Sequence, residues 1–123
     1  MLYSTLRKNE KSYFMIPEDK CGLNTLTQEK LCSVFAKYNS IDEVILYGSR
    51  AKGNFKLGSD IDLTIKSTQT SLSDLLKLEN EIDNLYLPYK VDISLFAQID
   101  NPSLVDHIQR AGLLFYKRPC GTS

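Results

Sequence analysis

Four short segments of the chain have the hydrophobic patterns of β-strands. Residues 44–47 form an unbroken apolar run, which is typical of a strand buried on both faces. Residues 60–65 and 90–96 alternate polar and apolar side chains, so each segment predicts a strand with one solvated face. A fourth short strand is expected over residues 113–116, directly after Gly112.

Three further segments have apolar positions at helical spacing. Thr25 and Gln28 fit a capping box, which predicts a first helix of about a dozen residues from Thr25. A second helix is expected over residues 72–85, and a third begins at Asn101-Pro102 and ends at Gly112. The order helix, strand, strand, helix, strand, helix, strand predicts an α/β fold with a mixed sheet.

Chemistry-bearing residues follow two of these strands. Gly48 and Ser49 leave the first strand and enter residues 50–53, which can form one helical turn with free backbone amides suited to phosphate. Asp60 and Asp62 are two positions apart at a strand start, so their side chains project to the same side. Asp92 lies on the polar face of a later alternating strand.

If the strand of Asp92 lies beside that of Asp60 and Asp62, three carboxylates converge. At a separation of ~5 Å and an effective dielectric of ~20, each like-charged pair costs roughly 3 kcal/mol. Either one acid holds its proton, or a divalent cation such as magnesium neutralises the group. Each feature alone has a plainer explanation, namely a simple turn, a solvated strand end or an exposed strand face. The joint pattern favours a catalytic site.

These residues carry a resemblance to a known family. The runs LYGSRAKG (46–53), GSDIDL (58–63) and VDIS (91–94) resemble the DNA polymerase β-like nucleotidyltransferases, and in particular the minimal nucleotidyltransferases. The resemblance spans roughly residues 25–116. It implies the nucleotidyltransferase fold, an α/β (α+β) fold with a mixed sheet and helices packed mainly on one face.

The resemblance also implies site roles. Asp60, Asp62 and Asp92 would be both the catalytic acids and the ligands of Mg²⁺, with two ions expected. Gly48 and Ser49 would hold the triphosphate of ATP. Arg50 and Lys52 are further nucleotide-binding candidates, although either residue can equally be a solvated surface charge.

By the same resemblance, the expected reaction is transfer of AMP from ATP to a tyrosine of a HEPN-domain ribonuclease toxin, for which the chain would be the antitoxin. Two alternatives stay open. The chain could be a steric antitoxin that does no chemistry, or a stand-alone nucleotidyltransferase for a small alcohol. The chain offers no obvious acceptor-binding domain, which weakens the small-alcohol alternative.

Composition limits the remaining possibilities. The 123 residues suit one domain, with an extension over residues 1–20, a nucleotidyltransferase domain over 21–116 and a tail over 117–123. A net charge of zero gives little support for direct nucleic-acid binding. Three unpaired cysteines, Cys21, Cys32 and Cys120, favour reduced thiols and a cytoplasmic location, and no segment is long and apolar enough for a membrane span.

Aromatic and imidazole side chains are weaker candidates. His107, the only histidine, is expected at the surface or partly packed in the third helix rather than as a catalytic base. Tyr47 and Tyr89 flank the expected cleft, and core packing explains both equally well.

Overall fold

A computed structural model describes residues 15–119, so Cys120, the rest of the expected tail beyond Pro119 and most of the expected N-terminal extension lie outside the described residues. The helices are α1 (Glu18–Cys21), α2 (Thr25–Ala36), α3 (Ser49–Lys52), α4 (Leu72–Asp83), the 3₁₀ turn η1 (Phe96–Gln98) and α5 (Pro102–Ala111). The strands are β2 (Glu43–Tyr47), β3 (Ile61–Lys66), β4 (Val91–Leu95) and β5 (Leu113–Lys117).

The strands form one mixed sheet in the order β4-β3-β2-β5. β2 pairs antiparallel with β3 and with β5, whereas β3 pairs parallel with β4. The parallel pair needs a crossover connection, and α4 supplies it. The mixed sheet predicted from the order of elements is therefore confirmed, with every predicted strand in place.

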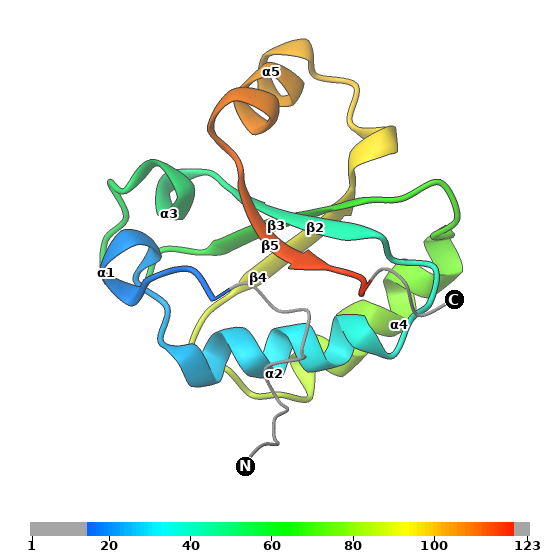
Figure 1. Ribbon diagram of the computed structural model, residues 1–123, viewed down its shortest axis with the longest axis horizontal. Helices are drawn as coiled ribbons and strands as arrows, with labels where there is room; N and C mark the ends of the chain where they lie inside the picture. The colour runs from blue at the N-terminus through cyan, green and yellow to red at the C-terminus, as the bar shows by residue number, and fades with distance from the viewer. Residues whose placement is uncertain (1–14, 120–123) are drawn as a thin grey trace.

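The two longest helices, α2 and α4, lie together on one side of the sheet, while α5 lies on the other side (Figure 1). Alternate residues of the strands, such as Leu46 and Leu63, are fully buried in a core that also contains Phe35 of α2 and Leu78 of α4. The expectation that residues 44–47 are buried on both faces is wrong. Ile45 and Tyr47 are only half-buried, because among residues 15–119 the short helix α5 is what packs against β2 on the face opposite the core.

The N-terminal cap of α2 differs from the prediction. The Asn24 side chain accepts a hydrogen bond from the Thr27 amide at 2.8 Å, so Asn24 caps the helix and Thr25 does not. The Gln28 side chain is buried and holds the preceding segment instead. It accepts from the Ile16 amide at 2.9 Å, and its Nε2 donates to the carbonyls of Ile16 and Leu23.

The other two helix starts agree with the prediction. Ser71 and Asp74 form a capping box at the start of α4, which ends at Asp83, two residues earlier than expected. Asn101 caps α5 by accepting from the Ser103 and Leu104 amides, and Pro102 is its first residue. These caps fix where each helix begins relative to the sheet.

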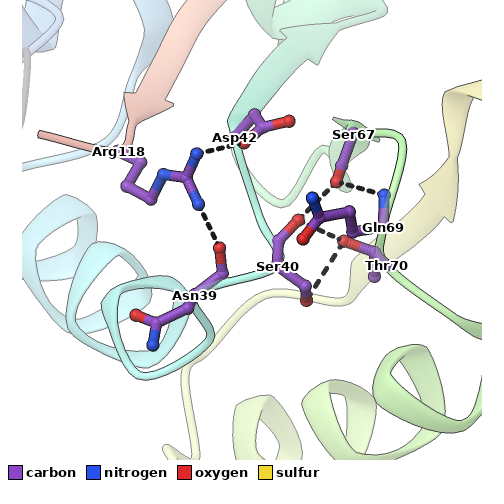
Figure 2. A network of polar contacts seen from close by, with 7 residues as sticks. All are labelled: Asn39, Ser40, Asp42, Ser67, Gln69, Thr70 and Arg118. Carbon is purple, nitrogen blue, oxygen red and sulfur yellow. Dashed lines mark hydrogen bonds and ion pairs between the residues drawn. The ribbon is translucent and has the colours of Figure 1, made fainter. Parts of the chain in front are cut away.

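Polar contacts hold together the end of the sheet where β2 begins and where β3 and β5 end (Figure 2). Arg118 forms an ion pair with Asp42 at 2.8 Å and donates to the Asn39 carbonyl. Ser67 and Thr70 both donate to the Ser40 carbonyl. This network anchors the loops remote from Gly48, which follows the other end of β2.

The start of the described chain packs on the core. Residues 15–20 belong partly to the folded unit, since Ile16 lies in the core and α1 begins at Glu18. Across residues 15–119, no helix combines the length and hydrophobicity that a membrane-spanning segment requires.

Candidate active site

Three side chains from neighbouring strands lie abreast at one end of the sheet. Asp62 of β3 is the register partner of both Tyr47 of β2 and Asp92 of β4. Adjacent strands are roughly 4.8 Å apart, and register partners project to the same face. The condition on which the sequence prediction depended, that the strand of Asp92 lies beside that of Asp60 and Asp62, is therefore met.

Asp62 is the half-buried member of the acidic group, whereas Asp60 and Asp92 are exposed. Burial raises the pKa of the Asp62 carboxyl above its ordinary value, and the negative charges of Asp92 and Asp60 raise it further. The positive charges of Arg50 and Lys90 oppose this shift. The Asp62 carboxylate therefore lies close enough to Asp92 and Asp60 to be repelled by both.

The turn after β2 lies directly against Asp62. Gly48 has φ 77° and ψ −153°, a backbone conformation that only glycine adopts readily. A Cβ atom on Gly48 would lie 2.5 Å from Oδ2 of Asp62. The Gly48 carbonyl accepts from the Ala51 and Lys52 amides and so begins α3, whose first amides, those of Ser49 and Arg50, have no intrahelical partner.

Arg50 is buried, with only 2% of its surface exposed, so it is not a solvated surface charge. Its Nε and Nη2 donate to the Ser59 carbonyl at 3.2 and 2.8 Å, and its Nη1 donates to the Cys21 carbonyl at 3.0 Å. The guanidinium also lies over two aromatic rings, 5.4 Å from the centre of Phe55 and 4.9 Å from that of Tyr89. Arg50 thus joins the turn to the residue before Asp60 and to the loop before β4.

Lys52 differs from Arg50 because it is exposed, on the last turn of α3. Its ammonium group is accessible to an anionic ligand. This short helix therefore carries two cationic side chains. The buried Arg50 is bonded to protein carbonyls, and the exposed Lys52 is open to solvent.

Behind the row of Tyr47, Asp62 and Asp92, hydroxyl groups bond to one another. Ser94 Oγ donates to Thr64 Oγ1 at 3.0 Å, and Thr64 Oγ1 donates to the Ser94 carbonyl at 3.4 Å. Burial raises the pKa of Tyr47, and the charges of Asp62 and Asp92 add to the shift. Of the two aromatic candidates, Tyr47 thus lies beside Asp62, whereas Tyr89 contacts the Arg50 guanidinium.

His107 is part of this site in a way that the sequence did not reveal. It is half-buried, as expected of a partly packed side chain, and its Nε2 accepts a hydrogen bond from the Gly48 amide at 3.0 Å. The two residues are far apart in the chain, and no local pattern in α5 distinguishes this histidine from a surface one.

The fit of the site to a metal ion depends on its donor atoms. Within residues 15–119, no three His, Cys, Asp or Glu side chains lie close enough to hold a metal ion as they stand. Even so, the donor set is three carboxylates, and all-oxygen ligands suit a hard cation such as Mg²⁺. The mutual repulsion that raises the Asp62 pKa is the kind that such a cation relieves. Because Asp60 and Asp92 are exposed, their side chains have room to turn towards a cation.

Comparison with protein families identifies the family to which this chain belongs. Residues 29–119 match the family model described as polymerase beta, nucleotidyltransferase. The chain belongs to this family. The nucleotidyltransferase therefore has the predicted fold, and the row of acids facing a glycine-serine turn lies within the matched residues.

Solved structures agree on the fold. A chain from the crystal structure of a toxin–antitoxin with AMP-PNP is 16% identical with a TM-score of 0.60, and the match covers 73% of each chain. A chain from the complex of tri-AMPylated Shewanella oneidensis HEPN toxin with MNT antitoxin is 14% identical with a TM-score of 0.57, covering 77% of this nucleotidyltransferase and 73% of that chain. A MntA–HepT toxin–antitoxin structure gives 14% identity, a TM-score of 0.57 and coverage of 76% and 73%. Comparison with curated protein sequences gave no significant match.

Proposed function

We propose that this nucleotidyltransferase transfers AMP from ATP to a hydroxyl group of a partner protein, a tyrosine of a HEPN ribonuclease toxin, and thereby acts as its cytoplasmic antitoxin. The observation that carries the chemistry is the contact between Gly48 and Asp62, which sets a phosphate-binding turn against a group of carboxylates. The partner is proposed by analogy with the HEPN–MNT and MntA–HepT complexes that share the fold.

The turn would bind the nucleotide. Backbone amides at Ser49 and Arg50 are suited to phosphate oxygens, and the exposed Lys52 adds a positive charge beside them. The buried Arg50 would act mainly by holding this turn in place, because its donor groups already bind the carbonyls of Ser59 and Cys21.

The carboxylates would act at the α-phosphate. The acceptor oxygen forms a bond to the α-phosphorus, the bond from that phosphorus to the oxygen of the β-phosphate breaks, and pyrophosphate leaves. Asp92 is exposed and lies beside Asp62, so it is placed to take the proton of the acceptor hydroxyl. Asp60, Asp62 and Asp92 would hold Mg²⁺, two ions in this proposal, which when bound neutralises the carboxylates and stabilises the charge on the phosphates.

A protein acceptor suits the shape of the site. Asp60 and Asp92 are exposed, and within residues 15–119 the part of the chain after β4 provides only η1, α5 and β5. A protein acceptor would bring its own binding surface to these exposed carboxylates. A folded partner that covers this end of the sheet would also exclude water, which strengthens electrostatic interactions with the phosphates.

The test is the mass of the partner after reaction. The chain is incubated with ATP, magnesium and a purified HEPN protein encoded beside it, and the partner is analysed by intact-mass spectrometry. We expect the partner to gain the mass of one or more AMP groups. The gain should be lost with Asp60→Asn or Asp62→Asn and kept with Asp83→Asn, which removes an exposed carboxylate at the end of α4, on the side of the sheet opposite α5.

The outcomes separate the alternatives. Inhibition of the partner's ribonuclease activity without any mass gain would mean a steric antitoxin and would overturn the proposed reaction. Transfer that persists in both Asp60→Asn and Asp62→Asn would place the chemistry elsewhere.

A further inference from the structure

We infer that His107 is a positioning residue for the nucleotide-binding turn, and that it acts as a neutral hydrogen-bond acceptor and not as a proton-transfer group. The inference rests on the proposed function of the turn at Gly48. Its basis is the hydrogen bond from the Gly48 amide to Nε2 of His107, 3.0 Å long and partly buried.

The Gly48 amide lies beyond the reach of the sheet. Pairing of β2 with β3 ends at Tyr47, and pairing of β2 with β5 ends at Leu46. A partly buried amide without an acceptor is costly, so a side chain from another element is needed to satisfy it. His107 of α5 provides that acceptor.

The bond fixes the peptide from which the turn starts. His107 holds the amide side of Gly48, while the Gly48 carbonyl accepts from the Ala51 and Lys52 amides. With both sides of this glycine held, the direction of the following Ser49 amide is set. Glycine has more backbone freedom than any other residue. A hydrogen bond from another element therefore restricts Gly48, with its φ of 77°, more than it would restrict another residue.

α5 is itself firmly placed, so it can act as a support. Ile108, next to the histidine, is buried with 4% of its surface exposed. At the end of the helix, a Cβ on Gly112 would lie 2.6 Å from Cγ2 of Ile45, which shows how closely the chain approaches β2. The imidazole also meets the Tyr47 ring edge-on, with centroids 6.3 Å apart and planes at 71°.

The hydrogen bond determines the protonation state of the imidazole. An amide N–H can only donate, so Nε2 must carry its lone pair and the proton of a neutral His107 must be on Nδ1. A ring in that state has no free lone pair. His107 therefore cannot accept the proton of an acceptor hydroxyl while it holds Gly48, which leaves that role to a carboxylate.

The direct test is nitrogen NMR of the intact chain, in which the single histidine gives an unambiguous signal. Long-range ¹H–¹⁵N correlation at neutral pH should show an unprotonated Nε2 and a protonated Nδ1. Free histidine favours the opposite tautomer, so this result is distinctive. A protonated Nε2, whether in the other tautomer or in an imidazolium, would overturn the inference without reference to any activity.

Binding of ATP, measured by calorimetry without an acceptor protein, supplies the second readout. His107→Gln keeps an acceptor atom in reach and should bind ATP within about twofold of the wild type, whereas His107→Phe keeps the ring but loses the acceptor and should bind at least about fivefold more weakly. Gln109→Ala, an exposed change on the same helix, is the control and should bind normally.

These measurements test the role of His107 independently of the proposed AMP transfer. If the wild type binds ATP and shows the predicted tautomer but modifies no partner, the reaction fails and the inference stands. Equal ATP affinity of His107→Phe and the wild type would overturn the inference even if the partner is modified. Should His107→Phe not fold, the tautomer and the Gln variant still decide the matter.

Discussion

Asp62 lies so close to Gly48 that a Cβ atom on the glycine would be 2.5 Å from Oδ2 of the carboxylate. The turn that begins α3 and the strand that carries the acids are therefore in direct contact. A phosphate bound at the turn would lie beside the carboxylates, and no side chain can be added between them without moving one or the other.

Gly48→Ala should therefore abolish AMP transfer. The added methyl group displaces the Asp62 carboxylate and opposes the φ of 77°, and misplacement of a reacting group by about 1 Å can lower a rate about a hundredfold. The rate is measured by intact mass of the partner with time.

Gly53→Ala is the matched control, because Gly53 also has positive φ but nothing lies within 4 Å of its added Cβ. It should cost roughly 1–2 kcal/mol of stability and leave transfer largely unchanged. Equal losses of transfer in both variants would mean that the contact with Asp62 is unimportant.

Asp62→Asn should inactivate the enzyme and stabilise the fold at neutral pH. The raised pKa of Asp62 means that the folded state binds this proton more tightly than the unfolded state. Stability therefore falls as pH rises from the ordinary aspartate pKa through the raised value, and the destabilisation is complete above it. Asp62→Asn lacks this destabilisation by the ionised carboxylate. Its melting temperature should therefore exceed that of the wild type at neutral pH, and the difference should vanish in acid. A lower melting temperature for the variant at neutral pH would contradict this electrostatic account.

Arg50→Lys should mainly lower the stability of the fold, whereas Lys52→Ala should mainly weaken ATP binding. The lysine cannot reproduce the bonds of Arg50 to the Ser59 and Cys21 carbonyls or its contacts with the Phe55 and Tyr89 rings, so the free energy of unfolding should fall by about 3 kcal/mol. Lys52 is exposed, and its removal should change stability by less than about 0.5 kcal/mol while weakening ATP binding. Urea denaturation and calorimetry measure the two quantities. Wild-type stability of Arg50→Lys would show that the buried guanidinium does not hold the site together.

Tyr38→Phe tests the packing of the turn after α2 against α4, separately from the site. The Tyr38 hydroxyl donates to Oε2 of Glu81 at 2.6 Å. Burial and this hydrogen bond raise the pKa of Tyr38 to about 12. The same hydrogen bond lowers the pKa of Glu81. Loss of the bond should cost about 1 kcal/mol of stability and leave transfer intact. Because the glutamate pKa is lowered, this stabilisation is lost as pH falls through the folded-state value, so the difference between variant and wild type should shrink in acid. A constant difference at all pH values would exclude the ionised bond as its source.

Local patterns were sufficient for most of the fold. Alternation and apolar runs located β2, β3 and β4, and capping residues located the starts of α4 and α5. The same reasoning failed at Gln28, whose partner Ile16 is 12 residues earlier in the chain. A local capping pattern cannot reveal that a side chain is buried beneath a distant segment, and Asn24 was available to cap the helix instead.

The candidate site could be proposed from the sequence to the extent that its chemistry is carried by motifs. Gly48, Asp60, Asp62 and Asp92 could be singled out because glycine and carboxylates have restricted roles at such spacings. The parallel pairing that sets Asp92 beside Asp62 follows from the sheet order, which the sequence only suggested. The part played by His107 depends on a contact across 59 positions, and the burial of Arg50 depends on Cys21 at the end of α1 and on the two loops that carry Ser59 and Tyr89. Such contacts leave no local pattern.

The most direct test of nucleotidyl transfer at this site is a crystal of the chain grown with Mn²⁺ and AMP-PNP, measured at the manganese absorption edge. We predict an anomalous peak bounded by the carboxylates of Asp62 and Asp92, with the phosphates of the nucleotide against Gly48 and Ser49. A nucleotide bound away from this turn, or manganese bound only at other carboxylates, would contradict the proposed site.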